Sequence, residues 1–143
     1  MKKILVTGGA GFIGTNLIKE LKTKDYDVVS IDNYSTGSKE NHLKGVNYID
    51  IDIENISKIK VSNFDTCFHL AAQSRVQPSF DNPQESVRVN VTGTVKVMEW
   101  AKKNNIKVIY AGSSSKHHNP ADSPYAMSKF LAEEICKLYK TSF

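Results

Sequence analysis

The chain has 143 residues, 40% of them hydrophobic, and a formal net charge of +4 from 19 basic and 15 acidic residues. This length is typical of one domain, residues 1–143, that buries a hydrophobic core. The lysines are scattered, and no basic run is interleaved with aromatic residues. The composition therefore disfavours nucleic-acid binding. Two cysteines lie far apart in apolar runs, which is typical of buried side chains and not of a disulfide framework.

The N-terminal stretch "MKKILVTGG" has two lysines followed by only a short apolar run. A signal peptide needs a longer apolar stretch, and a membrane-spanning helix a longer one still. We therefore expect a cytoplasmic protein with no membrane association.

Short apolar runs alternate with segments of helical spacing along the chain. Strands that alternate with helices predict an α/β fold, with a parallel sheet covered on both faces. The polar stretch at 33–45 is expected to be a surface loop or a short helix. In chain order we predict a strand at 2–7, a helix at 12–24, strands at 27–32, 46–53 and 64–72, a helix at 83–104, a strand at 106–112 and a helix at 126–139.

The helix at 83–104 starts at a proline that follows Asp81-Asn82, a good capping pair. Apolar residues recur along one side of it, which fits either the core or an interface. These residues are Val87, Val91, Val95 and Met98. Four apolar residues mark the last helix in the same way: Phe130, Leu131, Ile135 and Leu138.

The stretch "TGGAGFIG" places Gly8, Gly11 and Gly14 three residues apart, directly after a strand and at the start of a helix. Glycine allows a tight turn, a close approach of the backbone to a pyrophosphate, and close packing of helix on sheet. The phosphates then bind free N–H groups at the positive end of the helix, around Phe12 and Ile13. A purely structural strand-to-helix turn is the alternative.

Asp32 ends the second predicted strand, eighteen residues after Gly14. An acid there accepts hydrogen bonds from the adenosine ribose hydroxyls and repels a 2′-phosphate. No arginine or lysine follows before Lys39, so the sequence favours NAD over NADP. Asn33, the next residue, belongs to the same predicted site.

Two later strand ends contribute further candidates for cofactor binding. Asp52-Ile53 follows the third strand and is either a contact to the adenine amino group and ring or a solvated strand end. Leu70 and Ala71-Ala72 end the fourth strand, where small side chains let a cofactor lie against the backbone. His69, within that strand, is expected to be a core residue.

Tyr125 and Lys129 are four residues apart, which puts both on one face of a helix. Tyrosine is a weak base at its ordinary pKa of about 10, and a neighbouring ammonium lowers that pKa. The pair then serves as a general base and acid for a hydroxyl. Such a pair on its own is more typical of an exposed helical surface.

The combination of motifs resembles the extended short-chain dehydrogenase/reductase superfamily, and within it the NAD-dependent epimerase/dehydratases that act on nucleotide sugars. The matching stretches run in the family's order along nearly the whole chain: "TGGAGFIG", "IDN", "DIDI", "HLAAQSRVQPSFDNP", "NVTGTVKVMEWAKKN", "YAGSSS" and "SPYAMSK". The resemblance implies a doubly wound Rossmann-type sheet in the order 3-2-1-4-5.

The resemblance also implies roles for individual residues. Tyr125 corresponds to the catalytic base, and Lys129 holds the nicotinamide ribose. The catalytic serine is either Ser113 or Ser114, depending on where the match is anchored. Lys116-His117-His118 stands where dehydratases carry an Asp-Glu pair, which favours a 4-epimerase acting on UDP-glucose or UDP-N-acetylglucosamine by transient C4 oxidation. Another nucleotide-sugar dehydratase or reductase remains an alternative.

The chain departs from the family pattern in two ways. The loop between the serines and Tyr125 is short, and the C-terminal lobe that binds the nucleotide sugar is expected to be absent. A module that binds NAD without turnover is therefore a second hypothesis. The resemblance implies a homodimer formed through the helices at 83–104 and 126–140. No metal is expected, since His117-His118 is followed by no ligand cluster.

Overall fold

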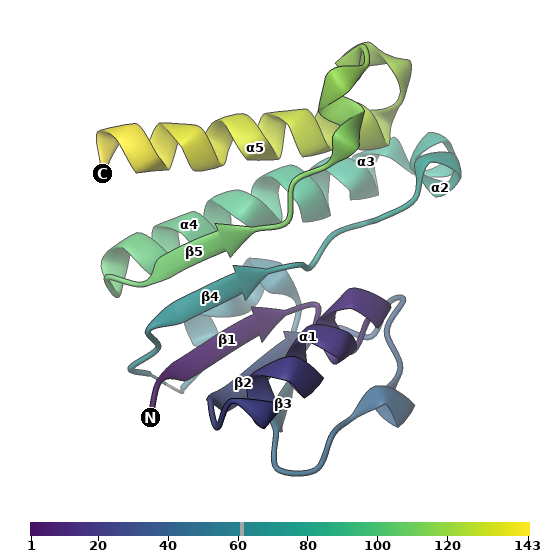
Figure 1. The fold of residues 1–143 in the computed structure, drawn as a ribbon. Coiled ribbons are helices and arrows are strands. Elements are labelled where there is room, and N and C mark those ends of the chain that lie inside the picture. The colour runs from purple at the N-terminus through teal and green to yellow at the C-terminus, as the bar shows by residue number, and fades with distance from the viewer. Residues whose placement is uncertain (61) are drawn as a thin grey trace.

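Five parallel strands form one sheet in the order β3-β2-β1-β4-β5 (Figure 1). The structure is a computed structural model and describes residues 1–60 and 62–143. The order confirms the predicted doubly wound sheet, with the change of direction between β1 and β4, where such sheets bind ligands. The strands are β1 (Lys3–Thr7), β2 (Asp27–Asp32), β3 (Asn47–Asp50), β4 (Thr66–His69) and β5 (Lys107–Tyr110).

The central strands are continuous apolar runs because helices cover both of their faces. Leu5 of β1 pairs with Val29 of β2 and Cys67 of β4, and all three side chains are buried. The outer strands β3 and β5 are shorter than predicted and are only partly buried.

Helices lie on both sides of the sheet, with α1 in front of it and α4 behind it in Figure 1. Alternate residues of β1 point to opposite faces of the sheet and pack in two different hydrophobic clusters. Ile4 packs in the cluster with Ile18 of α1, and Leu5 packs in the cluster with Val97 of α4. Helix α5 lies beyond β5 and contacts α4. The helices are α1 (Phe12–Thr23), α2 (Val76–Asp81), α3 (Pro83–Ser86), α4 (Gly93–Lys103) and α5 (Pro124–Ser142).

Short helical turns complete the described chain. They include the single turn within the polar stretch 33–45, as expected. Four are 3₁₀ turns and η3 is a π-helical segment: η1 (Lys39–Asn41), η2 (Ile53–Lys58), η3 (Val87–Thr92), η4 (Ser114–His117) and η5 (Pro120–Asp122).

The helix predicted at 83–104 is present as α3, η3 and α4 in succession. Its cap is confirmed, because the Asn82 side chain accepts a hydrogen bond from the Glu85 amide and Pro83 takes the first helical position. The residues it buries are small or polar at its start. On the predicted apolar side, Val87 is exposed, and Val91, Val95 and Met98 are partly buried. The buried set is Ser86, Asn90, Gly93, Thr94, Val97, Trp100 and Ala101.

Helix α5 starts at a similar cap, with the Ser123 hydroxyl accepting a hydrogen bond from the Ala126 amide. Its buried residues are again small or polar, and Leu131 and Leu138 are 39% and 55% exposed. The buried set is Ala126, Ser128, Lys129 and Ala132. Both helices therefore pack closely through small residues and leave apolar side chains at the surface.

Candidate active site at the carboxyl edge of the sheet

The glycine turn between β1 and α1 is shaped by contacts within the protein at two of the three glycines predicted to bind a cofactor. Gly8 has a φ of +73°, and a Cβ there would lie 2.8 Å from the Ala71 nitrogen. A Cβ on Gly14 would lie 2.3 Å from the Gly8 carbonyl oxygen. At Gly11, by contrast, a Cβ would meet its nearest protein atom only at 3.4 Å. The protein's own packing therefore does not require glycine at position 11, and the bare backbone leaves room for a ligand.

Helix α1 begins directly beneath this space. Its N-cap, Gly11, offers no side-chain cap, and its first turn carries no acidic residue. The first N–H groups of a helix have no partner within the helix, and its dipole is positive at this end. Phe12 and Ile13 are 85% and 67% exposed there. The turn can therefore accept an anionic group such as a pyrophosphate.

Asp32 lies at the end of β2 and bonds to the glycine turn. Its carboxylate accepts hydrogen bonds from the Ala10 and Tyr34 amides, both at 2.9 Å. The Ala10 carbonyl oxygen accepts a further bond from the Asn41 side chain at 2.7 Å. The acid predicted from the sequence is thus fixed beside the turn and partly exposed.

Asp52 and Asn33 also meet, since the Asn33 amide donates to Asp52 over 2.9 Å. Asp52 is in addition paired with Arg88, at 3.1 Å. Partial burial acts to raise the pKa of Asp52, but hydrogen bonds from Arg88, the Glu54 amide and Asn33 outweigh it, so this pKa lies below its usual value. Asp52 is therefore a bonded acid and not a freely solvated strand end. The neighbouring Ile53 side chain is buried in the core.

The residues after β4 are hydrogen-bonded to the end of β1. The Thr7 hydroxyl oxygen accepts bonds from the amides of Leu70 and Ala71, both at 3.1 Å. Ala71 and Ala72 are partly exposed beyond this point. The Ala71 backbone lies beside Gly8, because a Cβ on Gly8 would come within 2.9 Å of the Ala71 Cα atom.

His69 is buried and joins β1 to α4 through both ring nitrogens, which confirms its predicted core position. Nδ1 lies 2.8 Å from the Thr7 hydroxyl and Nε2 lies 3.0 Å from the Thr94 hydroxyl. Thr94 donates its own proton to the Asn90 carbonyl oxygen. Thr94 therefore accepts from Nε2–H, and Thr7 donates to Nδ1. Burial, with the nearby Lys129 charge, lowers the pKa of His69 to about 3, so the ring is neutral.

Asn90 is a functional candidate that the sequence reasoning missed. It is buried, and its side chain bonds to both the amide and the carbonyl of Gln73 and to the Ser128 hydroxyl. Ser128 in turn donates to the Tyr125 carbonyl oxygen. Asn90 thus connects the loop after β4 to the start of α5. It lies in the π-helical segment η3, a rare geometry that is frequent at functional sites.

Lys129 is buried near the end of β5. Its ammonium donates to the Ala111 carbonyl oxygen at 2.7 Å and lies 4.3 Å from the centre of the Tyr110 ring. Burial lowers the pKa of Lys129 to about 8, although Cys136 and Glu133 act in the opposite direction. Tyr125 lies one helical turn earlier, and its amide is held by the Ser79 hydroxyl at 3.0 Å.

The two candidate serines differ in their surroundings. The Ser113 hydroxyl accepts bonds from the amide and the hydroxyl of Ser115 and is partly buried, whereas Ser114 is exposed. The η4 turn that follows Ser113 contacts α5. The structure therefore brings the serine segment to the same edge of the sheet as Tyr125 and Lys129.

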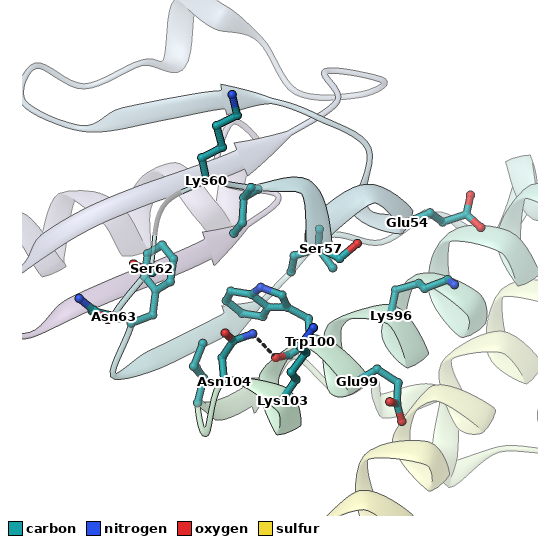
Figure 2. Close-up of a pocket in the computed structure, with 14 residues that line it drawn as sticks. Glu54, Ser57, Lys60, Ser62, Asn63, Lys96, Glu99, Trp100, Lys103 and Asn104 are labelled. Atoms are coloured by element: carbon teal, nitrogen blue, oxygen red, sulfur yellow. Dashed lines mark hydrogen bonds between the residues drawn. The ribbon is translucent and has the colours of Figure 1, made fainter.

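A separate surface hollow of about 510 Å³ lies at the opposite, amino edge of the sheet (Figure 2). Trp100 lines it, and the Asn104 side chain, which donates to the Trp100 carbonyl oxygen at 2.7 Å, lies beside it. It contains none of the predicted site residues.

Within residues 1–60 and 62–143, no helix combines the length and apolar character needed to cross a bilayer. In the same part of the chain, no three side chains among His, Cys, Asp and Glu gather into a metal-binding group.

Comparison with known proteins gives consistent matches along the chain. The model of the NAD dependent epimerase/dehydratase family matches residues 4–143. A putative UDP-glucose 4-epimerase of Methanocaldococcus jannaschii is 36% identical over 95% of this chain and 50% of its own length. The crystal structure of the UDP-glucose 4-epimerase of Thermotoga maritima with UDP-glucose matches 99% of this chain and 52% of that chain, with a TM-score of 0.92 and 26% identity.

The crystal structure of the UDP-glucose 4-epimerase of Brucella ovis in complex with NAD is also similar. The match includes all of this chain and 49% of that chain, with a TM-score of 0.90 and 26% identity. The chain thus spans about half the length of the curated relatives it matches.

Proposed function

Because the chain belongs to the NAD dependent epimerase/dehydratase family, we propose that it binds NAD and, in a protein of its relatives' length, epimerises a nucleotide sugar at C4. UDP-glucose and UDP-N-acetylglucosamine are the proposed substrates. One observation carries this proposal. A buried lysine, fixed one helical turn after Tyr125, lies at the same sheet edge as an uncapped helix start with space above Gly11.

The cofactor half of the proposal rests on the fit of the residues present. The α1 N-terminus and the glycine turn would hold the pyrophosphate, with Phe12 and Ile13 over it. Asp32 would accept bonds from the adenosine ribose, and the charge of its carboxylate disfavours a 2′-phosphate. The end of β4, at Leu70 to Ala72, would lie along the cofactor. When bound, NAD supplies a hydride acceptor for C4 of the sugar.

Residues of this chain would carry out the proton transfers. Tyr125 takes the proton from the sugar's O4 and later returns it, and Lys129 lies one turn away on the same face of the helix. With a pKa of about 8, Lys129 carries its positive charge in most molecules at pH 7. We assign the serine role to Ser113, because it is partly buried and bonded whereas Ser114 is exposed. Its hydroxyl would bond to the same substrate oxygen.

An epimerase is favoured over a dehydratase because no acidic pair follows the serines to remove and deliver the proton of an elimination. Much of the positioning for hydride transfer comes from contacts to substrate groups remote from the reacting carbon. We propose that the half of the relatives that this chain does not match supplies those contacts. The 143 residues alone would then bind NAD with little or no turnover.

We further propose a homodimer formed through the helices at 83–104 and 126–140. Val87, Leu131 and Leu138 are 48%, 39% and 55% exposed on these helices, which contact each other. Large apolar side chains that stay exposed on neighbouring helices are typical of interaction surfaces.

The test is a calorimetric titration of the chain with NAD and NADP, followed by an NMR assay of C4 inversion with both UDP-sugars. We expect NAD to bind more tightly than NADP and the 143 residues to show little inversion. A chain that binds neither cofactor would contradict the proposal. A protein of the relatives' length that carries these residues, binds NAD and inverts neither sugar would favour the binding module.

A further inference from the structure

Arg88 has every donor of its guanidinium bound to a carboxylate. The five N–H groups of an arginine side chain form a rigid fork. Nε and Nη2 donate to Glu85, both at 2.8 Å. Nη1 and Nη2 donate to the two oxygens of Asp52, at 3.1 and 3.2 Å. Nη1 also donates to Glu54. The guanidinium thus joins α3 to the segment that follows β3.

Asp52 is held from three directions by this arrangement. One carboxylate oxygen accepts from Arg88 and the Glu54 amide, and the other accepts from Arg88 and the Asn33 side chain. The bidentate pair fixes the plane of the carboxylate, since rotation would break two charge-assisted bonds at once. The Asp52 side chain nevertheless keeps 24% of its surface exposed. The acid is therefore oriented before any ligand arrives, with one side still open.

Arg88 also affects Asp52 through its positive charge. Without it, Asp52, Glu54 and Glu85 would place three negative charges beside a site proposed to bind a dinucleotide that is itself anionic. Arg88 offsets one of these charges and separates the remaining carboxylates, so Asp52 can accept a hydrogen bond there at a smaller electrostatic cost.

We propose that Arg88 is a positioning residue for the adenine end of the dinucleotide site. It holds Asp52 so that the exposed side of the carboxylate accepts a hydrogen bond from the exocyclic amino group of adenine. The inference rests on the proposed binding of NAD and adds the residue that sets recognition of the base. Asn33 acts with Arg88 by bonding to the same carboxylate from β2.

The test compares NAD with nicotinamide hypoxanthine dinucleotide, in which a carbonyl oxygen replaces the amino group. Both are titrated calorimetrically into the unmodified chain and its variants. A hydrogen bond to a charged group corresponds to about a tenfold preference for NAD in the unmodified chain. Arg88→Met should bring the ratio of the two affinities close to one. Arg88→Lys keeps the charge but not the fork, and should lower the ratio at least about threefold.

Two further variants test the acceptor Asp52 and a partner of Arg88 that does not contact it. Asp52→Asn removes the acceptor charge and should abolish the preference for NAD. Glu85→Gln changes a partner of Arg88 that does not contact Asp52, and should keep the preference. If Arg88→Met does not fold, as thermal unfolding would reveal, the charge-preserving Arg88→Lys carries the test.

The outcomes separate this inference from the proposed function. Equal binding of the two dinucleotides by the unmodified chain would overturn the adenine contact and leave NAD binding intact. Equal weakening of both dinucleotides in the Arg88 variants, with the ratio preserved, would overturn the positioning role. Binding of neither dinucleotide by the unmodified chain would overturn the proposed function and this inference with it.

Discussion

The ammonium of Lys129 and the carbonyl oxygen of Ala111 are 2.7 Å apart, so the last helix is bonded to the segment that leaves β5. A buried ammonium loses hydration, and this single backbone acceptor with the Tyr110 ring replaces only part of it. The protein therefore retains a charged group at a cost in stability, which is typical of functional positions.

Replacement of Lys129 by methionine should make the protein more stable near neutral pH. A shift of the pKa from 10.5 to about 8 corresponds to roughly 3 kcal/mol. Loss of the bond to Ala111 offsets part of this, which leaves a net gain of about 1–2 kcal/mol. NAD binding should weaken in the same variant if Lys129 holds the ribose. Urea unfolding and calorimetry measure the two effects, and lower stability with unchanged NAD binding would show a structural lysine.

The gain from this replacement should depend on pH with a definite sign. Between about pH 8 and 10.5 the unfolded chain binds the lysine proton and the folded chain does not, so the free energy of unfolding of the unmodified protein rises with pH. The advantage of Lys129→Met should therefore disappear across this window. Burial raises the pKa of Cys136 to about 11, with an effect of opposite sign above pH 9, so the difference between the two proteins is the quantity to compare.

Removal of the Tyr125 hydroxyl should leave both stability and NAD binding nearly unchanged. The backbone of Tyr125 is held through Ser79 and Ser128, and Tyr125→Phe retains those bonds. In a protein of the relatives' length, the same change should abolish C4 inversion in the NMR assay. A large fall in melting temperature with inversion retained would identify the hydroxyl as structural.

Substitution of Asp32 should weaken NAD binding and reduce the preference for NAD over NADP. Asp32→Ala removes both the proposed ribose acceptor and the bond to the Ala10 amide, and the expected loss is about tenfold or more in affinity. Asp50→Asn is the matched control, because Asp50 is an exposed acid on the neighbouring strand β3 and pairs with Lys39 of η1. Equal losses in both variants would point to a general charge effect.

Asn90→Leu should destabilise the protein by about 2–4 kcal/mol, because it leaves the partly buried amide and carbonyl of Gln73 without their partner and removes the bond to the Ser128 hydroxyl. The exposed Asn16, whose side chain bonds only to the Phe12 carbonyl oxygen of its own helix, provides the control Asn16→Leu, with an expected effect under about 0.5 kcal/mol. Urea denaturation measures both. Similar small effects would mean that the loop after β4 does not depend on Asn90.

Leu138→Glu should shift the protein from dimer to monomer in sedimentation experiments, because it places a charge in the proposed interface on α5. Lys19→Ala makes the same change in net charge on α1, on the other side of the sheet, and should leave the dimer intact. A monomer in the unmodified protein would contradict the interface directly.

The sequence predicted the strand order and most elements because their signals are local or follow from a match of motifs in order. Strand β2 and the caps at Asn82 and Pro83 are where the sequence predicted them. The outer strands are shorter than predicted, since apolar alternation continues past the residues that have a partner strand, as at Ile53.

The buried faces of the two long helices were not predictable from apolar spacing. On the helix at 83–104 the apolar periodicity selected a side that is not fully buried, with Val87 48% exposed and Val91, Val95 and Met98 partly buried. Asn90 and Thr94 are buried instead, and their side chains are hydrogen-bonded there. Polar and small residues give no periodic hydrophobic signal, and the π-helical turn shifts the phase. Arg88 was missed because its partner Asp52 lies 36 residues away in sequence.

The contact between Gly8 and Ala71 has a consequence for how the chain acquires its shape. The turn after β1 is encoded within the first fourteen residues, yet the Thr7 hydroxyl is held by amides that come more than sixty residues later, and Gly8 packs against the backbone of Ala71. Closure of so long a loop is slow compared with local turns and helices. In a chain synthesised from its N-terminus, the glycine segment therefore stays incomplete until β4 and the residues after it have emerged, and a fragment that stops before residue 70 should lack an ordered turn between β1 and α1.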